Sequence, residues 1–205
     1  MKEVKNKISK IYSGSIAEEM GIEEGDILLA INGKPVVDIM DYLFFMSDDY
    51  LTLDIEKKSG EIWELEVEKD YDEDVGLEFE NPILDDAKSC KNKCIFCYID
   101  QMPKGMRKTL YFKDDDSRLS FLQGNFVTLT NMNENDLERM VLYRISPVNI
   151  SVHTTNPELR VKMLGNKNAG SIMKRLEYLT DNAIEVNAQV VLCRGYNDLS
   201  ELDRT

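Results

Sequence analysis

Cys90-Lys91-Asn92-Lys93-Cys94-Ile95-Phe96-Cys97 is the stretch of this 205-residue chain from which its fold is best interpreted. The C-x3-C-x2-C spacing brings three thiols into one short loop, and thiolates are the typical ligands of an iron-sulfur cluster. A structural zinc site is disfavoured because zinc takes four protein ligands, and the only other thiol and imidazole are Cys193 and His153. Disulfides within so short a loop would be strained. The spacing therefore predicts a cluster held by three cysteines, with one iron left open.

An aromatic residue, Phe96, stands directly before the last cysteine of this loop. Together with it, Cys90, Cys94 and Cys97 resemble the cluster motif of the radical S-adenosylmethionine (SAM) superfamily. The resemblance implies a [4Fe-4S] cluster on these three metal ligands, with SAM chelating the fourth iron. It also implies a one-electron reductant, such as ferredoxin or flavodoxin, and hydrogen abstraction by a 5′-deoxyadenosyl radical.

Three further segments, at 97–105, 111–116 and 124–131, extend the resemblance to a narrower family. They resemble a bacterial family whose members join an N-terminal PDZ-like domain to a radical SAM domain and a C-terminal domain of unknown function. The resemblance spans essentially the whole chain, while members of that family are considerably longer. We therefore expect an N-terminal fragment that is inactive alone, with its radical SAM-like part truncated at the C-terminus.

Charge divides the chain into two parts. The whole chain has a formal net charge of -13, yet residues 1–86 hold 8 basic and 24 acidic side chains, and residues 87–205 hold 17 and 14. Pro82 and its polar neighbours lie near the change, which predicts one domain at 1–82 and a second at 83–205. The acidic first part argues against nucleic-acid binding, because phosphate affinity is built from lysine and arginine.

The sequence contains no apolar stretch long enough to predict a membrane span, and residues 1–7 lack the apolar core of a signal peptide. Four cysteines, three of them clustered, fit a reducing compartment. We therefore expect a cytoplasmic protein with no membrane partner.

The first part of the chain alternates apolar and polar residues as short strands do, with helical segments between them. Strands are predicted at 8–12, 27–31, 51–56 and 62–67, and helices at 16–20 and 37–46. Residues 14–33, with turns at Gly25-Asp26 and Asn32-Gly33, resemble bacterial PDZ domains. In PDZ domains a loop rich in glycine binds a peptide carboxylate, and nothing suitable for that role precedes the first strand.

Residues 75–79 resemble this loop and its strand, placed after the body as in circularly permuted PDZ domains. The resemblance implies that Gly76, Leu77 and Phe79 bind the C-terminus of a peptide or protein. Glu78 replaces the second glycine of the motif, and its carboxylate would repel an incoming carboxylate unless it points away. The alternative is a domain that docks onto its own barrel and binds no free peptide.

After the cysteine loop, strand and helix patterns alternate. Strands are predicted at 126–130, 148–152 and 184–192, and helices at 135–143 and 169–181. Such alternation predicts parallel β/α units. The expected fold class is therefore α/β, with a small β-rich PDZ-like domain followed by a partial (β/α) barrel.

Polar residues at the ends of these strands are candidates for cofactor contacts, because ligands bind at the C-terminal edge of parallel sheets. Thr130 and Asn131 stand where many radical SAM enzymes carry a glycine-rich segment that holds the methionyl amine, and they are equally suited to cap the strand. Asn187 and Gln189 alternate with apolar residues, so both could face a bound adenosine.

His153, in Ser151-Val-His-Thr-Thr155, is the candidate catalytic residue. It could contact ribose or substrate, act as an acid or base, or be a structural histidine at the end of a strand. Cys193 lies on a later strand and is interpreted as a buried thiol.

The sequence thus favours a radical SAM enzyme whose substrate is not specified. A peptide-binding scaffold whose cluster transfers electrons or senses redox state is the second hypothesis, and a zinc-binding regulator is the third. Binding of SAM to the open iron would distinguish the enzyme from the peptide-binding scaffold. Metal analysis of anaerobically purified protein would distinguish both from the zinc-binding regulator.

Overall fold

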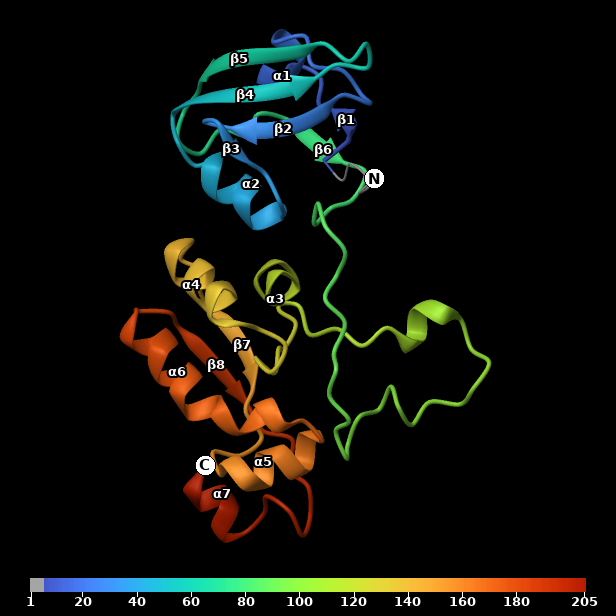
Figure 1. Cartoon of the computed structure of the whole chain (residues 1–205), viewed down its shortest axis with the longest axis vertical. Coiled ribbons are helices and arrows are strands. Elements are labelled where there is room, and N and C mark those ends of the chain that lie inside the picture. Colours follow the sequence, from blue (N-terminus) through green and yellow to red (C-terminus); the bar gives the residue numbers. More distant parts are fainter. Residues whose placement is uncertain (1–5) are drawn as a thin grey trace. The chain divides into compact units, whose positions relative to one another are not determined.

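The computed structural model describes residues 6–205, and the chain divides into two compact units, Met1–Asp86 and Ala87–Thr205 (Figure 1). Residues 1–5, part of the segment without a signal-peptide core, lie outside the described residues. Within residues 6–205, none of the helices has the length and apolar character needed to cross a bilayer.

The first unit is built on an antiparallel sheet with the strand order β3-β2-β4-β5. Its strands are β2 (Ile27–Ile31), β3 (Lys34–Pro35), β4 (Tyr50–Glu56) and β5 (Ile62–Glu68). A second antiparallel pair joins β1 (Ile8–Ile11) to β6 (Leu77–Phe79). Alternate residues of β4, namely Leu51, Leu53 and Ile55, are fully buried in the core, as its alternating pattern predicts.

Two short helices complete this unit, α1 (Ile16–Glu19) and α2 (Ile39–Phe45). Each begins at a residue whose side chain caps it: Ser15 accepts a backbone N–H of α1, and Asp38 accepts two from α2. Residues 75–79, which resemble the permuted carboxylate loop, contain β6. This strand comes late in the sequence of the unit and pairs with β1 near its start.

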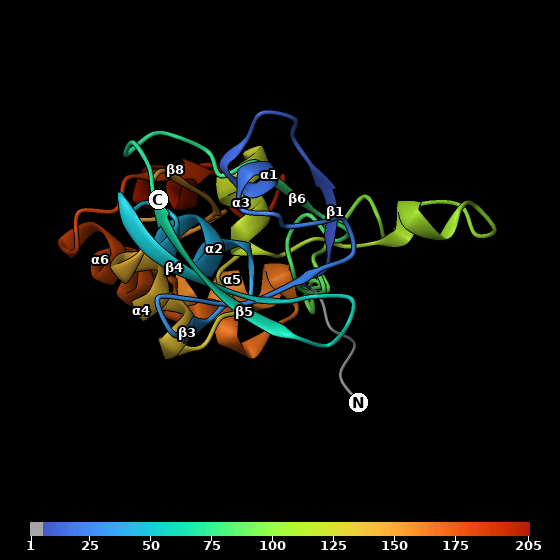
Figure 2. The same cartoon turned by 90° about the horizontal axis from the view of Figure 1, so that it is seen from above.

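The second unit contains two hydrogen-bonded parallel strands, β7 (Val148–Ser151) and β8 (Val186–Gln189). Its α-helices are α3 (Ser117–Gln123), α4 (Glu134–Leu142), α5 (Pro157–Leu164), α6 (Ile172–Asp181) and α7 (Ser200–Arg204). Two 3-10 helices, η1 (Lys108–Tyr111) and η2 (Lys167–Ser171), lie in the connections. The chain between the cysteine loop and α3 extends away from the strands of its unit in both views (Figures 1 and 2).

A barrel is not seen in residues 6–205, because the parallel sheet is open. The strand predicted at 126–130 is reduced to one parallel bridge between Val127 and Ile150. Just beyond it, the Thr128 N–H donates to the Asp115 carboxylate at 2.6 Å, and Leu129 takes a positive φ of 60°. Both features divert the backbone from a strand.

Helices α3 and α5 were not predicted from the sequence. The reason is that both bury polar side chains: α3 buries Arg118 and two serines, and α5 buries Arg160 beside Met163 and Leu164. Their buried faces therefore lack the continuous apolar stripe by which an amphipathic helix is recognised.

Candidate functional site

The cysteine loop, residues 90–97, contributes its three thiols to one wall of a cavity of about 590 Å³. Cys90, Cys94 and Cys97 are free and half-buried. The loop runs along the end of α5, where the Lys93 and Ile95 N–H groups donate to the carbonyls of Leu164 and Met163 at 2.8 and 2.9 Å. Three potential ligands thus face the same space.

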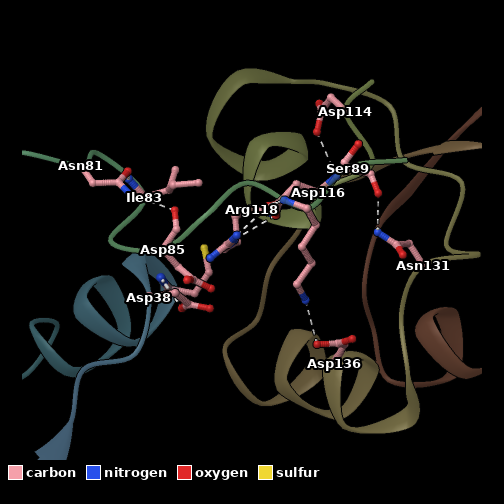
Figure 3. Close-up of polar contacts among 12 residues, drawn as sticks. Asp38, Asn81, Ile83, Asp85, Ser89, Asp114, Asp116, Arg118, Asn131 and Asp136 are labelled. Carbon is pink, nitrogen blue, oxygen red and sulfur yellow. Dashed lines mark hydrogen bonds and ion pairs between the residues drawn. The ribbon is translucent and has the colours of Figure 1, made fainter. Parts of the chain in front are cut away.

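The chain entering this loop is fixed by polar contacts with later parts of the second unit (Figure 3). The Lys88 N–H donates to the Asp116 carboxylate at 2.8 Å, and the Lys88 ammonium contacts Asp136 at 3.0 Å. Asn131 points toward the Ser89 carbonyl and donates to it at 3.2 Å. The start of the loop is therefore held at the beginning of α3 and α4.

The cavity is also lined by residues at the ends of the strand-like segments of the second unit. Thr128, Ser151, His153 and Gln189 line the cavity from three neighbouring parts of the open sheet. Apolar side chains complete it, namely Phe96, Ile99, Phe112, Phe126 and Val191. A few convergent polar groups in a largely apolar cavity are what small-molecule sites present.

His153 is buried, with 3 % of its surface exposed, and its ring lies edge-on to Phe96 at a centroid distance of 4.7 Å. The Val191 N–H donates to its Nδ1 at 3.2 Å, which leaves the proton of the neutral ring on Nε2. Burial, and secondarily the charge of Arg160, lower the pKa of His153 to about 4. At neutral pH this side chain is an uncharged hydrogen-bond donor.

The Cys90 and Cys94 thiols are protonated in the metal-free protein. Burial, followed by the neighbouring thiols, raises the pKa of Cys94 to about 12, and burial raises the pKa of Cys90 as well. A metal ion must therefore displace protons from this loop when it binds, which makes metal binding dependent on pH.

A second candidate site lies in the first unit, in a groove of about 270 Å³ between α2 and β6. It is lined by Ile39, Tyr42, Leu77, Glu78, Phe79 and Pro82. Gly76 precedes β6 with a φ of 92°, and a Cβ there would collide with the Ser15 side chain. The Glu78 carboxylate contacts the Tyr12 hydroxyl and lies 3.7 Å from the Lys10 ammonium. Its charge is therefore partly neutralised by groups of β1 and the residue that follows.

Comparisons with known proteins identify the families of the two parts of the chain. The family model of a radical SAM-like domain matches residues 69–205. The chain belongs to this radical SAM-like family. The model of a PDZ domain matches residues 7–57, and no curated protein matches the chain. Together the two matches confirm the predicted combination of PDZ and radical SAM-like domains.

The radical SAM-like family implies a metal cluster, and the donor set of the cysteine loop fits one. Three thiols of one loop face a shared cavity, and a fourth protein ligand is not needed where a small molecule completes the coordination. No three His, Cys, Asp or Glu side chains among residues 6–205 are already arranged to hold a metal ion. Holding a cluster would therefore require the three thiols to move closer together.

The structure separates the remaining sequence-predicted residues of the radical SAM-like domain. Gln189 and His153 line the cysteine cavity, whereas Thr130 and Asn131 line a neighbouring polar pocket of about 470 Å³. Asn187 is exposed, donates to Asn149 at 3.0 Å, and is not among the residues that line the cavity.

Cys193 lies beside the apolar cluster formed by Met163, Leu164 and Ala169, against which Cys94 and Phe96 also pack. Its N–H donates to the Asn197 side chain at 2.7 Å. It is half-buried, and burial raises its pKa.

Sequence reasoning missed the buried polar groups that support the cavity. Arg160 is 1 % exposed and donates to the carbonyls of Thr128, Ser151, Val152 and Ala169 at 2.7 to 3.0 Å. It thereby joins segments that line the cavity to η2. An arginine on a helix is ordinarily a surface residue, so the sequence offered no signal for this role.

Proposed function

We propose that the second unit is a radical SAM enzyme domain in which Cys90, Cys94 and Cys97 hold a [4Fe-4S] cluster and the adjoining cavity receives SAM. The observation that carries the proposal is the shared cavity: the three thiols and the polar strand-end residues, contributed by segments far apart in sequence, line the same space. The match to the radical SAM-like family supports it.

When bound, the cluster and SAM supply a 5′-deoxyadenosyl radical that abstracts hydrogen from a substrate, after reduction by a donor such as ferredoxin or flavodoxin. The residues of the cavity bind and orient. His153 presents an Nε2–H donor, Gln189 presents a donor and an acceptor, and Phe96 and Phe126 exclude water. Lys113, whose ammonium contacts Asp100 at 2.8 Å, and Asp114 line the same cavity and offer a charged donor and a charged acceptor.

The proposal extends to the architecture. We assign residues 1–82 to a PDZ-like domain in which β6 takes the place of the carboxylate-loop strand, as in circularly permuted PDZ domains. We assign residues 83–205 to part of a (β/α) barrel. The contact between β1 and β6 supports the first assignment. The parallel order of the segment at Val127, β7 and β8 supports the second.

The test is anaerobic reconstitution of this chain with iron and sulfide, followed by titration with SAM. We expect Cys94→Ala to lose iron and visible absorbance, while Cys193→Ala retains both. SAM should perturb the electron paramagnetic resonance spectrum of the reduced cluster. Equal loss of iron in the two variants would refute the assignment of ligands. A cluster that ignores SAM would favour an electron-transfer or redox-sensing scaffold instead.

A second function, capture of a peptide C-terminus, is favoured by the groove between α2 and β6. β6 pairs with β1 on one side, and a bound peptide would add as a strand along its other side, with apolar side chains against Ile39, Tyr42 and Phe79. Glu78 is engaged by Tyr12, which reduces its repulsion of a carboxylate.

This second function is tested on the whole chain with short peptides that end in apolar residues. Binding should be lost when the peptide C-terminus is amidated, since the carboxylate is then absent. Equal binding of free and amidated peptides, or no binding to a diverse set, would support a domain that serves only in docking within the protein.

A further inference from the structure

Asn92 occupies the middle of the stretch between the first two cysteines, and it is 2 % exposed. Its neighbours Lys91 and Lys93 are both exposed. Burying an amide in a loop of this kind is unfavourable unless its polar atoms find partners, because it loses its hydrogen bonds to water. The amide of Asn92 must therefore be satisfied by the protein.

Both polar atoms of the Asn92 side chain have partners outside the cysteine loop. Its Nδ2 donates to Thr128 Oγ1 at 2.9 Å. Its Oδ1 accepts from Thr130 Oγ1 at 2.9 Å and from Asn166 Nδ2 at 2.6 Å. Thr128 Oγ1 donates in turn to the buried Asp115 carboxylate at 2.8 Å. The loop is thereby joined to the end of the strand-like segment and to the residue that caps η2.

The backbone of Asn92 takes part in two more contacts. Its carbonyl accepts from the Lys113 ammonium at 2.8 Å, and its N–H points to Cys90 Sγ at 3.5 Å. Hydrogen bonds to the sulfur ligands of an iron-sulfur cluster are among the features that set its reduction potential. The side chain of Asn92 therefore fixes a peptide group that touches the first cysteine.

We propose that Asn92 is a positioning residue for the cluster ligands: its buried amide sets the course of the cysteine loop and holds its own N–H against Cys90 Sγ. The cluster part of this inference rests on the proposed function of the three cysteines. The anchoring part rests only on the contacts of the metal-free protein. The Thr130 hydroxyl is accordingly a partner of the loop and not a free cofactor contact.

The anchoring is tested by amide hydrogen exchange on the metal-free chain. In Asn92→Ala we expect exchange of the Lys93 and Ile95 amides to become at least about tenfold faster, since about three side-chain hydrogen bonds are lost. Thr130→Val, which removes one of them without a change in shape, should show a smaller acceleration at the same amides. Unchanged exchange in both variants would overturn the proposal.

Asn149→Ala is the matched control. Asn149 also uses its amide in the second unit, donating to the Gly124 carbonyl at 2.8 Å, and none of its described hydrogen bonds reaches the cysteine loop. It should leave exchange at Lys93 and Ile95 as in the natural sequence. The same acceleration in this control would show a general loss of stability and would count against a positioning role.

The cluster is tested by its reduction potential and its electron paramagnetic resonance spectrum after reconstitution. Alanine retains the backbone N–H of residue 92 but no longer holds it against Cys90 Sγ. Because a weaker hydrogen bond to a sulfur ligand disfavours the more negative, reduced state, Asn92→Ala should have a lower potential and altered g values, with Asn149→Ala unchanged. An unchanged potential in Asn92→Ala would overturn the cluster part. Should the natural chain itself bind no cluster, the proposed function fails, while the exchange measurements still decide the anchoring.

Discussion

The neutral state of His153 has a measurable consequence for stability. In the unfolded chain an imidazole titrates near 6.5, whereas the pKa of buried His153 is about 4 in the folded protein. Between these two values the unfolded state binds the proton and the folded state does not. Stability is therefore lost as pH falls through this window.

The size of the effect follows from the two pKa values. Lowering the pH from about 7 to about 5 should cost about 2 kcal/mol of unfolding free energy, and going below the folded pKa should cost about 3 kcal/mol in all. Asp115, whose pKa is raised first of all by burial, also contributes to the pH dependence of stability. The contribution of His153 is therefore the difference between the natural chain and His153→Gln in denaturant unfolding at each pH.

The same prediction has a direct spectroscopic test, because His153 is the only histidine of the chain. A proton NMR titration of the imidazole resonances should show no protonation until the pH falls well below 6. A midpoint near the ordinary value, or an unchanged pH dependence of stability in His153→Gln, would refute the buried, neutral ring. It would also remove the Nε2–H donor from the proposed cavity.

Three further substitutions test the supports of the two sites. Arg160→Met should lower the unfolding free energy by about 3 to 5 kcal/mol in thermal or denaturant unfolding, because it strands buried carbonyls; a loss below about 1 kcal/mol would contradict this. Gly76→Ala should abolish peptide binding and lower the unfolding free energy more than Gly14→Ala does. Gly14 also has a positive φ, but the space around it is open. Equal losses of unfolding free energy would show that the collision before β6 is relieved. Gly165→Ala places a Cβ 2.9 Å from the Lys93 carbonyl, so it should lower iron content after reconstitution as it displaces the cysteine loop, and full iron retention would contradict that close approach.

Much of the local structure was predictable because it depends on neighbouring residues. The alternation in β4 and β5 and the helical patterns of α4 and α6 act within a few positions, and these elements form close to where the sequence predicts them. The cysteine spacing places three thiols in one short loop, and the proposed cluster rests on that spacing.

The segment at 126–130 shows where local reasoning stops. Its composition predicts a strand, yet the backbone N–H of Thr128 finds the Asp115 carboxylate in place of a neighbouring strand. Arg160 is a second example. Its buried guanidinium interrupts the apolar stripe of α5, so the sequence lacks the periodic pattern by which an amphipathic helix is recognised. In both cases a partner distant in sequence outweighs the local preference.

The sequence by itself indicated the three clustered thiols of the cysteine loop, the PDZ-like body and the α/β character of the second unit, because these follow from residue type and short-range pattern. Only the tertiary structure decided which strand-end residues line the cavity: Gln189 and His153 line it, whereas the Thr130 hydroxyl donates to Asn92. It also decided that the His153 imidazole is neutral. The physical reason is that burial and hydrogen-bond partners are properties of the folded chain, set by contacts between residues tens of positions apart.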